Sequence, residues 1–85
     1  MVYKLLFDDK VSKDLKNIDK KWQKKILEII KTKLIDNPYI GKKLVGDLSP
    51  YYRYRVNSYR IIYEILEDEV VLLVIKIKHR KDVYK

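Results

Sequence analysis

The chain has 85 residues, enough for a single domain around one modest hydrophobic core. Hydrophobic residues make up 47% of it, and two glycines and two prolines are too few for a disordered or low-complexity chain. The lack of cysteine excludes a disulfide framework and a thiolate zinc site, and the net charge of +8 favours a polyanionic partner.

Three kinds of polyanion fit that charge: nucleic acid, a membrane surface or an acidic protein segment. A lysine-rich proteome would also produce a basic surface without any binding role. No apolar run approaches the roughly 18 residues that span a membrane. The N-terminus "MVYKLLFDDK" has no signal-peptide pattern, so we expect a cytoplasmic protein without a membrane partner.

The first half of the chain predicts a strand followed by two helices. Residues 2–7, "VYKLLF", form a short apolar and β-branched run. From Asp8 onward the apolar residues recur at helical spacing, and Asp19 is placed to cap a second helix. The buried positions expected on the two helices are Val11, Leu15, Ile18, Trp22, Ile26, Ile29, Ile30 and Leu34. "DNP" at residues 36–38 ends this helical hairpin.

The second half alternates with period two and predicts a β-hairpin around Asn57-Ser58. That turn pairs Val56 with Tyr59 and Arg55 with Arg60, and cross-strand partners share a face. One face then carries Tyr52, Tyr54, Val56, Tyr59, Ile61, Tyr63 and Ile65. The other face carries Arg53, Arg55 and Arg60, and a one-residue slip would place these arginines in the core.

A last strand over residues 70–77 follows a turn expected at residues 67–69. With a three-residue loop, the apolar face gains Val71, Leu73, Ile75 and Ile77, and the basic face gains Lys76 and Lys78, with Lys76 opposite Arg60. A two-residue loop would reverse this. The predicted fold is one α+β domain over residues 1–85, in the order β-α-α-β-β-β: an antiparallel sheet with an N-terminal helical hairpin on one face.

The arginines are unevenly distributed along the chain. It has sixteen lysines but four arginines, and three of these lie at positions 53, 55 and 60. Like charges opposite one another in a sheet are destabilising, and the planar guanidinium binds phosphate bidentately. We therefore interpret Arg53, Arg55 and Arg60 as a phosphate site. The simpler alternative is a solvated outer face with arginines lying over the sheet.

Among the tyrosines, those at positions 52, 54, 59 and 63 are expected in the core. Tyr51 falls on the basic face and could stack on a base, and Tyr84 lies in the tail near Arg80. The single histidine, His79, excludes a site of several imidazoles. Basic residues, one histidine and one tyrosine are sufficient to cleave RNA without metal, because the 2′-OH of the substrate serves as nucleophile. Tyr84 and His79 both remain candidates for proton transfer.

The element order, the hairpin "YRYRVNSYRIIYEI" and the closing "VLLVIKIKHRKDVYK" resemble the RelE/ParE superfamily of type II toxin–antitoxin toxins, most closely its RelE branch. The resemblance covers essentially the whole chain. It implies a toxin neutralised by a cognate RelB-like antitoxin. It also implies an endoribonuclease that needs no cofactor or metal and cuts mRNA in the ribosomal A site, leaving a 2′,3′-cyclic phosphate and a 5′-OH.

By this resemblance Arg53, Arg55 and Arg60 hold the scissile phosphate, Arg80 assists the leaving oxygen, and Tyr84 activates the 2′-OH. His79 is the reserve acid or base. The residues expected to contact RNA around this centre are Tyr51, Lys76, Lys78 and Lys81. Two alternatives stay open: a ParE-like inhibitor of DNA gyrase, and a degenerate toxin that only binds its antitoxin and, through that complex, operator DNA.

Overall fold

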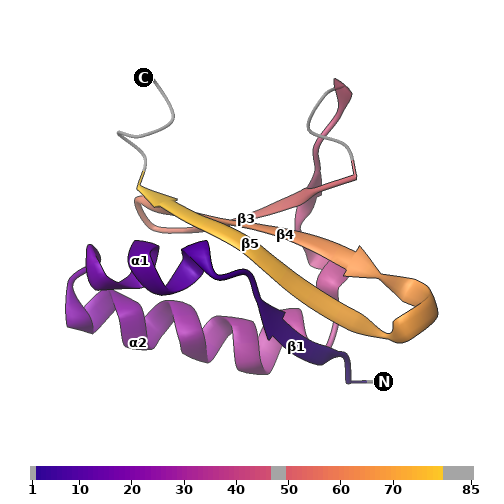
Figure 1. Cartoon of the computed structure of the whole chain (residues 1–85), viewed down its shortest axis with the longest axis horizontal. Coiled ribbons are helices and arrows are strands. Elements are labelled where there is room, and N and C mark those ends of the chain that lie inside the picture. Colours follow the sequence, from indigo (N-terminus) through magenta and orange to yellow (C-terminus); the bar gives the residue numbers. More distant parts are fainter. Residues whose placement is uncertain (1, 47–49, 80–85) are drawn as a thin grey trace.

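The computed structural model describes residues 2–46 and 50–79, which form a helical layer packed on a five-stranded sheet (Figure 1). The sheet order is β1-β5-β4-β3-β2. In chain order the elements are β1 (Lys4–Phe7), α1 (Lys10–Lys16), α2 (Lys20–Ile29), the π-helical turn η1 (Ile30–Leu34), the 3-10 turn η2 (Pro38–Ile40), β2 (Lys42–Lys43), β3 (Tyr52–Val56), β4 (Tyr59–Leu66), the 3-10 turn η4 (Glu67–Glu69) and β5 (Val71–His79). The α+β class is confirmed.

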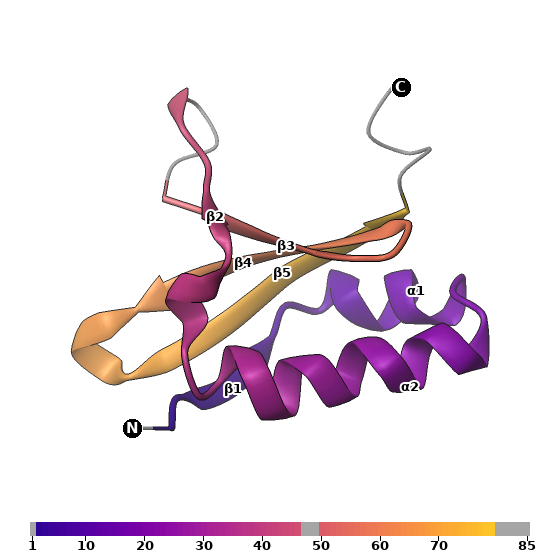
Figure 2. The same ribbon diagram turned by 180° about the vertical axis from the view of Figure 1, so that it is seen from behind.

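The predicted helical hairpin is present, and Figure 2 shows both helices on the same side of the sheet. Ile26, Ile30 and Leu34 are fully buried along α2 and η1. Asp19 precedes α2 as predicted, but its side chain makes no capping hydrogen bond; its backbone carbonyl accepts from Trp22 and Gln23 instead. No helix among the described residues is both long and apolar enough to cross a bilayer.

The β3–β4 hairpin has the register that the sequence predicts. Val56 pairs with Tyr59, Arg55 with Arg60, and Tyr52 with Tyr63. Asn57 adopts a positive φ of 54° in the turn, which asparagine tolerates better than most residues. Tyr63 is fully buried, and Tyr52, Tyr54 and Tyr59 pack against the core, so the assignment of these four tyrosines is confirmed.

The β4–β5 pairing differs from the prediction because the turn is longer and β5 contains a bulge. Leu66 pairs with Val71, which leaves four residues in the loop, and the register shifts at Ile75. The β5 residues in the core cluster are Leu72, Val74 and Ile77, not Val71, Leu73 and Ile75 as expected. Lys78, not Lys76, lies opposite Arg60, and Lys76 lies opposite Ile62.

The sheet is mixed, because β1 runs parallel to its neighbour β5 whereas the other strand pairs are antiparallel. A parallel neighbour requires a long crossover connection. Here the chain leaves β1 through both helices and returns to it only with its last strand. The helical layer is thereby fixed to the face of the sheet opposite the arginines.

Tyr63 ties the sheet to the segment that precedes β2. Its hydroxyl donates a 2.6 Å hydrogen bond to the carbonyl oxygen of Pro38. Burial raises the pKa of Tyr63 to about 12. A Cβ atom added at Gly41 would overlap the Tyr63 hydroxyl and lie 2.8 Å from the carbonyl oxygen of Arg53. Glycine at position 41 thus permits this segment to approach β3 next to one of the candidate site residues.

Candidate nucleic-acid interface

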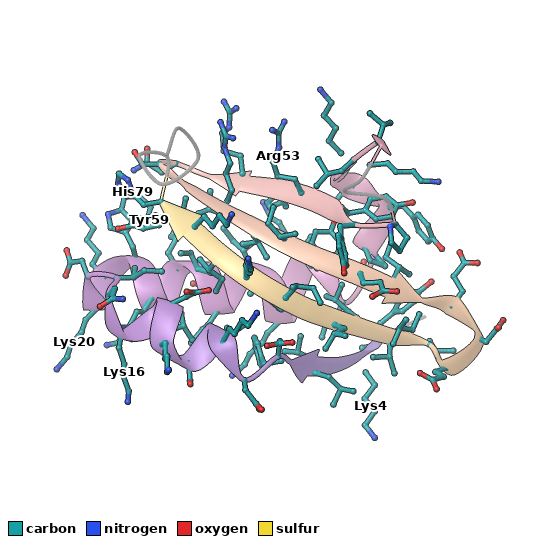
Figure 3. The ribbon with its side chains drawn as sticks, turned by 45° about the horizontal axis from the view of Figure 1, so that its top comes forward. Lys4, Lys16, Lys20, Arg53, Tyr59 and His79 are labelled. Atoms are coloured by element: carbon teal, nitrogen blue, oxygen red, sulfur yellow. The ribbon has the colours of Figure 1, made fainter. Side chains whose placement is uncertain are left out.

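The face of the sheet opposite the helices carries two rows of side chains that cross three or four strands. In the first row Arg55 pairs with Arg60, and Arg60 pairs with Lys78. In the second row Lys42, Arg53, Ile62 and Lys76 follow one another across β2, β3, β4 and β5. Figure 3 shows Arg53 projecting from β3 on the side away from the helices. We call the six cations of these rows, Lys42, Arg53, Arg55, Arg60, Lys76 and Lys78, the basic face.

The spacing of the strands sets the electrostatics of the basic face. Adjacent strands lie about 4.8 Å apart, so the first row places unit positive charges at successive strand spacings. In the second row Ile62 separates the charges of Arg53 and Lys76. Arg55 is exposed, and Arg53 and Arg60 are half-buried. Cross-strand like charges repel by roughly 0.2–1 kcal/mol per pair. A bound anion would remove that repulsion and accept several charge-assisted hydrogen bonds.

The bulge at Ile75 brings the β5 lysines onto this face. Leu72 and Val74 point toward the helices, and uninterrupted alternation would have sent Lys76 and Lys78 into the core as well. The extra residue reverses the alternation, so that Ile77 is buried and both lysines face outward. Lys76 and Lys78 therefore do lie on the same face as the arginines, as predicted, although the bulge that brings them there was not foreseen.

Two residues near the basic face offer apolar contact. Ile62 is half-buried and lies between Arg53 and Lys76. Tyr51 directly precedes β3, and alternation along the strand puts it on the same face as Arg53 and Arg55, as predicted; its carbonyl oxygen accepts a 2.9 Å hydrogen bond from Leu44. Sequence reasoning missed Ile62 and Lys42. The hairpin register already pairs Ile62 with Arg53, and that was the available signal.

His79 lies on the other face of the sheet. It pairs with Tyr59, and the two rings meet edge to face with centroids 5.0 Å apart (Figure 3). Tyr59 in turn packs 6.3 Å from Trp22 of α2. The structure therefore groups His79 with the aromatic residues between sheet and helices and does not bring it together with the three arginines.

The remaining predicted site residues, Arg80, Lys81 and Tyr84, lie outside the described residues. The basic face itself supplies positive charge and hydrogen-bond donors, but arginine cannot accept a proton near neutral pH. It can hold and neutralise a phosphate, whereas proton transfer needs another group. Within residues 2–46 and 50–79, no three His, Cys, Asp or Glu side chains are grouped closely enough to hold a metal ion.

Comparison with known proteins gives a family match over nearly the whole chain. Residues 5–84 match the model of the family described as ParE toxin of the type II toxin–antitoxin system parDE. The chain is 32% identical, over an alignment of 90 residues, to the protein named "Putative toxin RelE1" of Methanocaldococcus jannaschii. That alignment covers 100% of this chain and 98% of the relative.

Solved structures show the same fold. A chain of the RelBE2 toxin–antitoxin complex from Mycobacterium tuberculosis superposes with a TM-score of 0.90 at 22% identity, over 94% of this chain and 93% of that one. A chain of the RelB–RelE antitoxin–toxin complex from Methanococcus jannaschii gives a TM-score of 0.73 at 28% identity, over 94% and 95% of the two chains. The arrangement of helices and sheet is therefore shared with both.

Proposed function

This chain belongs to the RelE/ParE superfamily of type II toxin–antitoxin toxins, and we propose that within it the chain is an endoribonuclease that cleaves mRNA. The observation that carries this proposal is the first row of the basic face, in which Arg55, Arg60 and Lys78 come from three adjacent strands. Three cations in a row, two of them guanidinium groups that can donate two hydrogen bonds each, can stabilise a phosphodiester whose negative charge increases during the reaction.

The chemistry proposed is metal-independent transesterification. The 2′-OH attacks the adjacent phosphorus, the bond to the 5′-oxygen breaks, and the products are a 2′,3′-cyclic phosphate and a 5′-OH. Arg53, Arg55 and Arg60 stabilise the charge that accumulates on the phosphorane oxygens. Tyr84 takes the proton of the 2′-OH. Arg80 stabilises the leaving 5′-oxygen, which takes a proton from water to become the 5′-OH. His79 remains the second candidate for proton transfer, although its place against Tyr59 favours Tyr84.

Partners follow from the same family. We propose that a RelB-like antitoxin neutralises the toxin in the cytoplasm and that the complex binds operator DNA. The structures of the RelBE2 complex and of the RelB–RelE complex support an antitoxin partner. We further propose that the mRNA is cut in the ribosomal A site, where the ribosome positions the substrate. Association with RNA should weaken steeply with salt, because it rests on contacts to phosphate.

The test is cleavage of a defined mRNA in a translating extract, with analysis of the new ends. Wild type, Arg60→Ala and Tyr84→Phe are compared, with Lys20→Ala as a control for loss of one positive charge. Lys20 is exposed at the start of α2, away from the basic face (Figure 3). Cyclic-phosphate ends made by wild type and Lys20→Ala but not by Arg60→Ala support the proposal. If Tyr84→Phe still cleaves, proton transfer passes to His79.

A second function has one observation in its favour, namely the family model, whose description names the ParE toxin. A ParE-like chain would inhibit DNA gyrase and would leave mRNA intact. A supercoiling assay with purified gyrase separates the two, since only a ParE-like chain would block the reaction. Wild-type protein silent in both assays, yet able to bind a RelB-like antitoxin, would be a toxin that has lost catalysis.

A further inference from the structure

A groove of about 410 Å³ lies between α1 and β5, next to the basic face. Its walls are Lys10, Lys13, Asp14, Lys76, Ile77 and Lys78, so that four of its six lining residues are lysines. Lys76 and Lys78 already belong to the basic face. Lys10 and Lys13 lie outside the basic face, and they extend its positive charge from the sheet onto the helical layer.

The local structure gathers these lysines in pairs. Lys10 and Lys13 are three residues apart on α1 and are therefore neighbours on one side of the helix. Lys76 and Lys78 are two residues apart on β5, about 6.6 Å along the strand, and share a face. The Asp14 carboxylate accepts a 3.0 Å hydrogen bond from the Ile77 backbone N–H. This bond joins helix to strand and holds the two pairs of lysines across the groove.

The groove continues the rows of the basic face. Lys78 ends the row that starts at Arg55, and Lys76 ends the row that contains Arg53. Two strand spacings, about 10 Å, separate the β3 arginines from the β5 lysines, and the groove begins there. An anionic polymer bound at the arginines therefore meets a second set of cations as it leaves the sheet at the β5 edge.

We propose that this groove binds the ribose-phosphate backbone of the RNA segment that flanks the cleaved nucleotide. The proposal rests on the ribonuclease function above and adds Lys10 and Lys13 to the RNA-binding surface. The groove has lysines where the candidate phosphate site has arginines. Lysine is a compact point charge without a bidentate fork, and such contacts position a backbone without reading its sequence.

An acidic protein strand fits the groove less well. The one apolar side chain in its wall, Ile77, is only 3% exposed and offers no anchor. The Ile77 N–H, a donor that a strand added at this edge would use, is already bound to Asp14. An acidic strand would therefore be held by charge alone, without the backbone hydrogen bonds and apolar pockets that strand addition uses. Charge is sufficient to bind a chain of phosphates.

The test is binding of fluorescein-labelled 2′-O-methyl RNA, a trinucleotide and a nonanucleotide, which the enzyme cannot cleave because the 2′-OH is blocked. Fluorescence anisotropy is measured between 50 and 200 mM salt. The double variant Lys10→Gln/Lys13→Gln is compared with Lys16→Gln/Lys20→Gln, which loses the same charge from exposed positions outside the groove. Removing one lysine–phosphate interaction should lower the log–log salt slope by about 0.7.

Because the groove variant lacks two phosphate-binding lysines, its salt slope for the nonanucleotide should be smaller by about 1.4. Wild type would then lose about sevenfold more affinity than the groove variant over that salt range. The trinucleotide should bind wild type and the groove variant with the same affinity and salt slope. The control variant should have the same salt slope as wild type for both RNAs. An equal change in both double variants, or no change in either, overturns the proposal. So does a groove variant that binds RNA normally but has lost binding of a synthetic polyglutamate peptide.

This result is independent of cleavage. Binding of the nonanucleotide through the groove by a chain that leaves mRNA intact would refute the ribonuclease and retain the groove. If a groove variant with unchanged RNA affinity still cleaved mRNA, the ribonuclease proposal would stand and the groove proposal would be refuted.

Discussion

Arg55 and Arg60 are direct cross-strand neighbours on the face of the sheet opposite the helices, so two positively charged side chains extend from opposed positions on adjacent strands. Lys78 continues the same row on β5. Each such pair is unfavourable by roughly 0.2–1 kcal/mol in the absence of an anion. The row therefore lowers the stability of the free protein, whereas in the proposed function it binds a phosphate, and the two effects can be separated by mutation.

Arg60→Gln should raise the free energy of unfolding slightly and abolish most of the cleavage activity. Glutamine removes the repulsion with both Arg55 and Lys78, for a gain of about 0.4–2 kcal/mol. Loss of one charge-stabilising donor should reduce the cleavage rate by about 100-fold or more. Urea unfolding can be followed through Trp22, the single tryptophan, which packs near Tyr59.

Lys20→Gln serves as the control, because Lys20 is exposed at the start of α2 and should change neither quantity by much. A clear loss of stability in Arg60→Gln would mean that the guanidinium makes a structural contact that outweighs the repulsion. The row would then be a feature of the fold and no longer an argument for an anion.

Gly41→Ala should destabilise the protein through steric overlap alone. Gly41 has φ −75°, which alanine also adopts, so backbone conformation does not oppose the change. The new Cβ would overlap the Tyr63 hydroxyl and approach the Arg53 carbonyl oxygen to 2.8 Å. Overpacking of this kind costs about 1–3 kcal/mol. Urea unfolding gives the value.

The same substitution in a Tyr63→Phe background should cost less, because the hydroxyl is gone. The contacts that remain are the Arg53 carbonyl oxygen at 2.8 Å and the ring carbon Cζ at 3.0 Å. The four proteins form a double-mutant cycle whose coupling energy isolates the overlap with the hydroxyl. An equal cost of Gly41→Ala in both backgrounds would show that the hydroxyl contributes nothing and that the Arg53 carbonyl and the ring of residue 63 determine the cost.

The hairpin of β3 and β4 could be predicted from the sequence because the turn residue and the alternation of polar and apolar residues favoured the same register. Asn57 marks the turn, and only one register keeps Arg53, Arg55 and Arg60 out of the core. The β5 register could not be read in this way. A bulge at Ile75 adds one residue and reverses the alternation, and simple period-two reasoning contains no signal for it.

Two other features depend on tertiary packing. β1 has an ordinary strand pattern, but nothing in that pattern says that its partner is β5 or that the pairing is parallel. Lys10 and Lys13 look like solvated helix residues until α1 is packed beside β5. The arginines of the site were predictable because one hairpin holds all three, whereas the groove depends on contact between Asp14 and Ile77, which are 63 residues apart in the sequence.

Val70→Asn should stabilise the protein. Val70 has φ 54° and ψ 48°, a left-handed conformation that costs a residue with a Cβ about 1–2 kcal/mol and is least suited to a β-branched one. Asparagine tolerates it, and the backbone hydrogen bond from the Lys4 N–H to the Val70 carbonyl can remain. The free energy of unfolding should rise by about 1 kcal/mol.

The matched control is Val2→Asn, the same chemical change at an exposed position without positive φ, for which we expect almost no effect. Lower stability in Val70→Asn would show that packing of the valine side chain outweighs the backbone strain. The comparison by urea unfolding at neutral pH needs no assay of function.

Ionisation of Tyr63 should lower the free energy of unfolding at alkaline pH. Burial raises the pKa of the folded-state hydroxyl to about 12, whereas an unfolded tyrosine titrates near 10. Between these two values the unfolded state loses the proton first, so the contribution of Tyr63 is complete below pH 10 and is lost as pH rises through 12. The slope is at most about 1.4 kcal/mol per pH unit.

Tyr63→Phe should lack this decline, so its unfolding free energy should converge on that of wild type as pH rises from 9 to 11. At neutral pH the variant should be less stable by about 1–2 kcal/mol, because the Pro38 carbonyl loses its donor. Tyr39→Phe, at a residue that is 44% exposed, should run parallel to wild type. All three proteins share every other titratable group except Tyr39, so the difference between the curves of wild type and Tyr63→Phe reports Tyr63. Parallel curves for Tyr63→Phe and wild type would mean that the buried hydroxyl ionises as readily in the folded protein as in the unfolded chain.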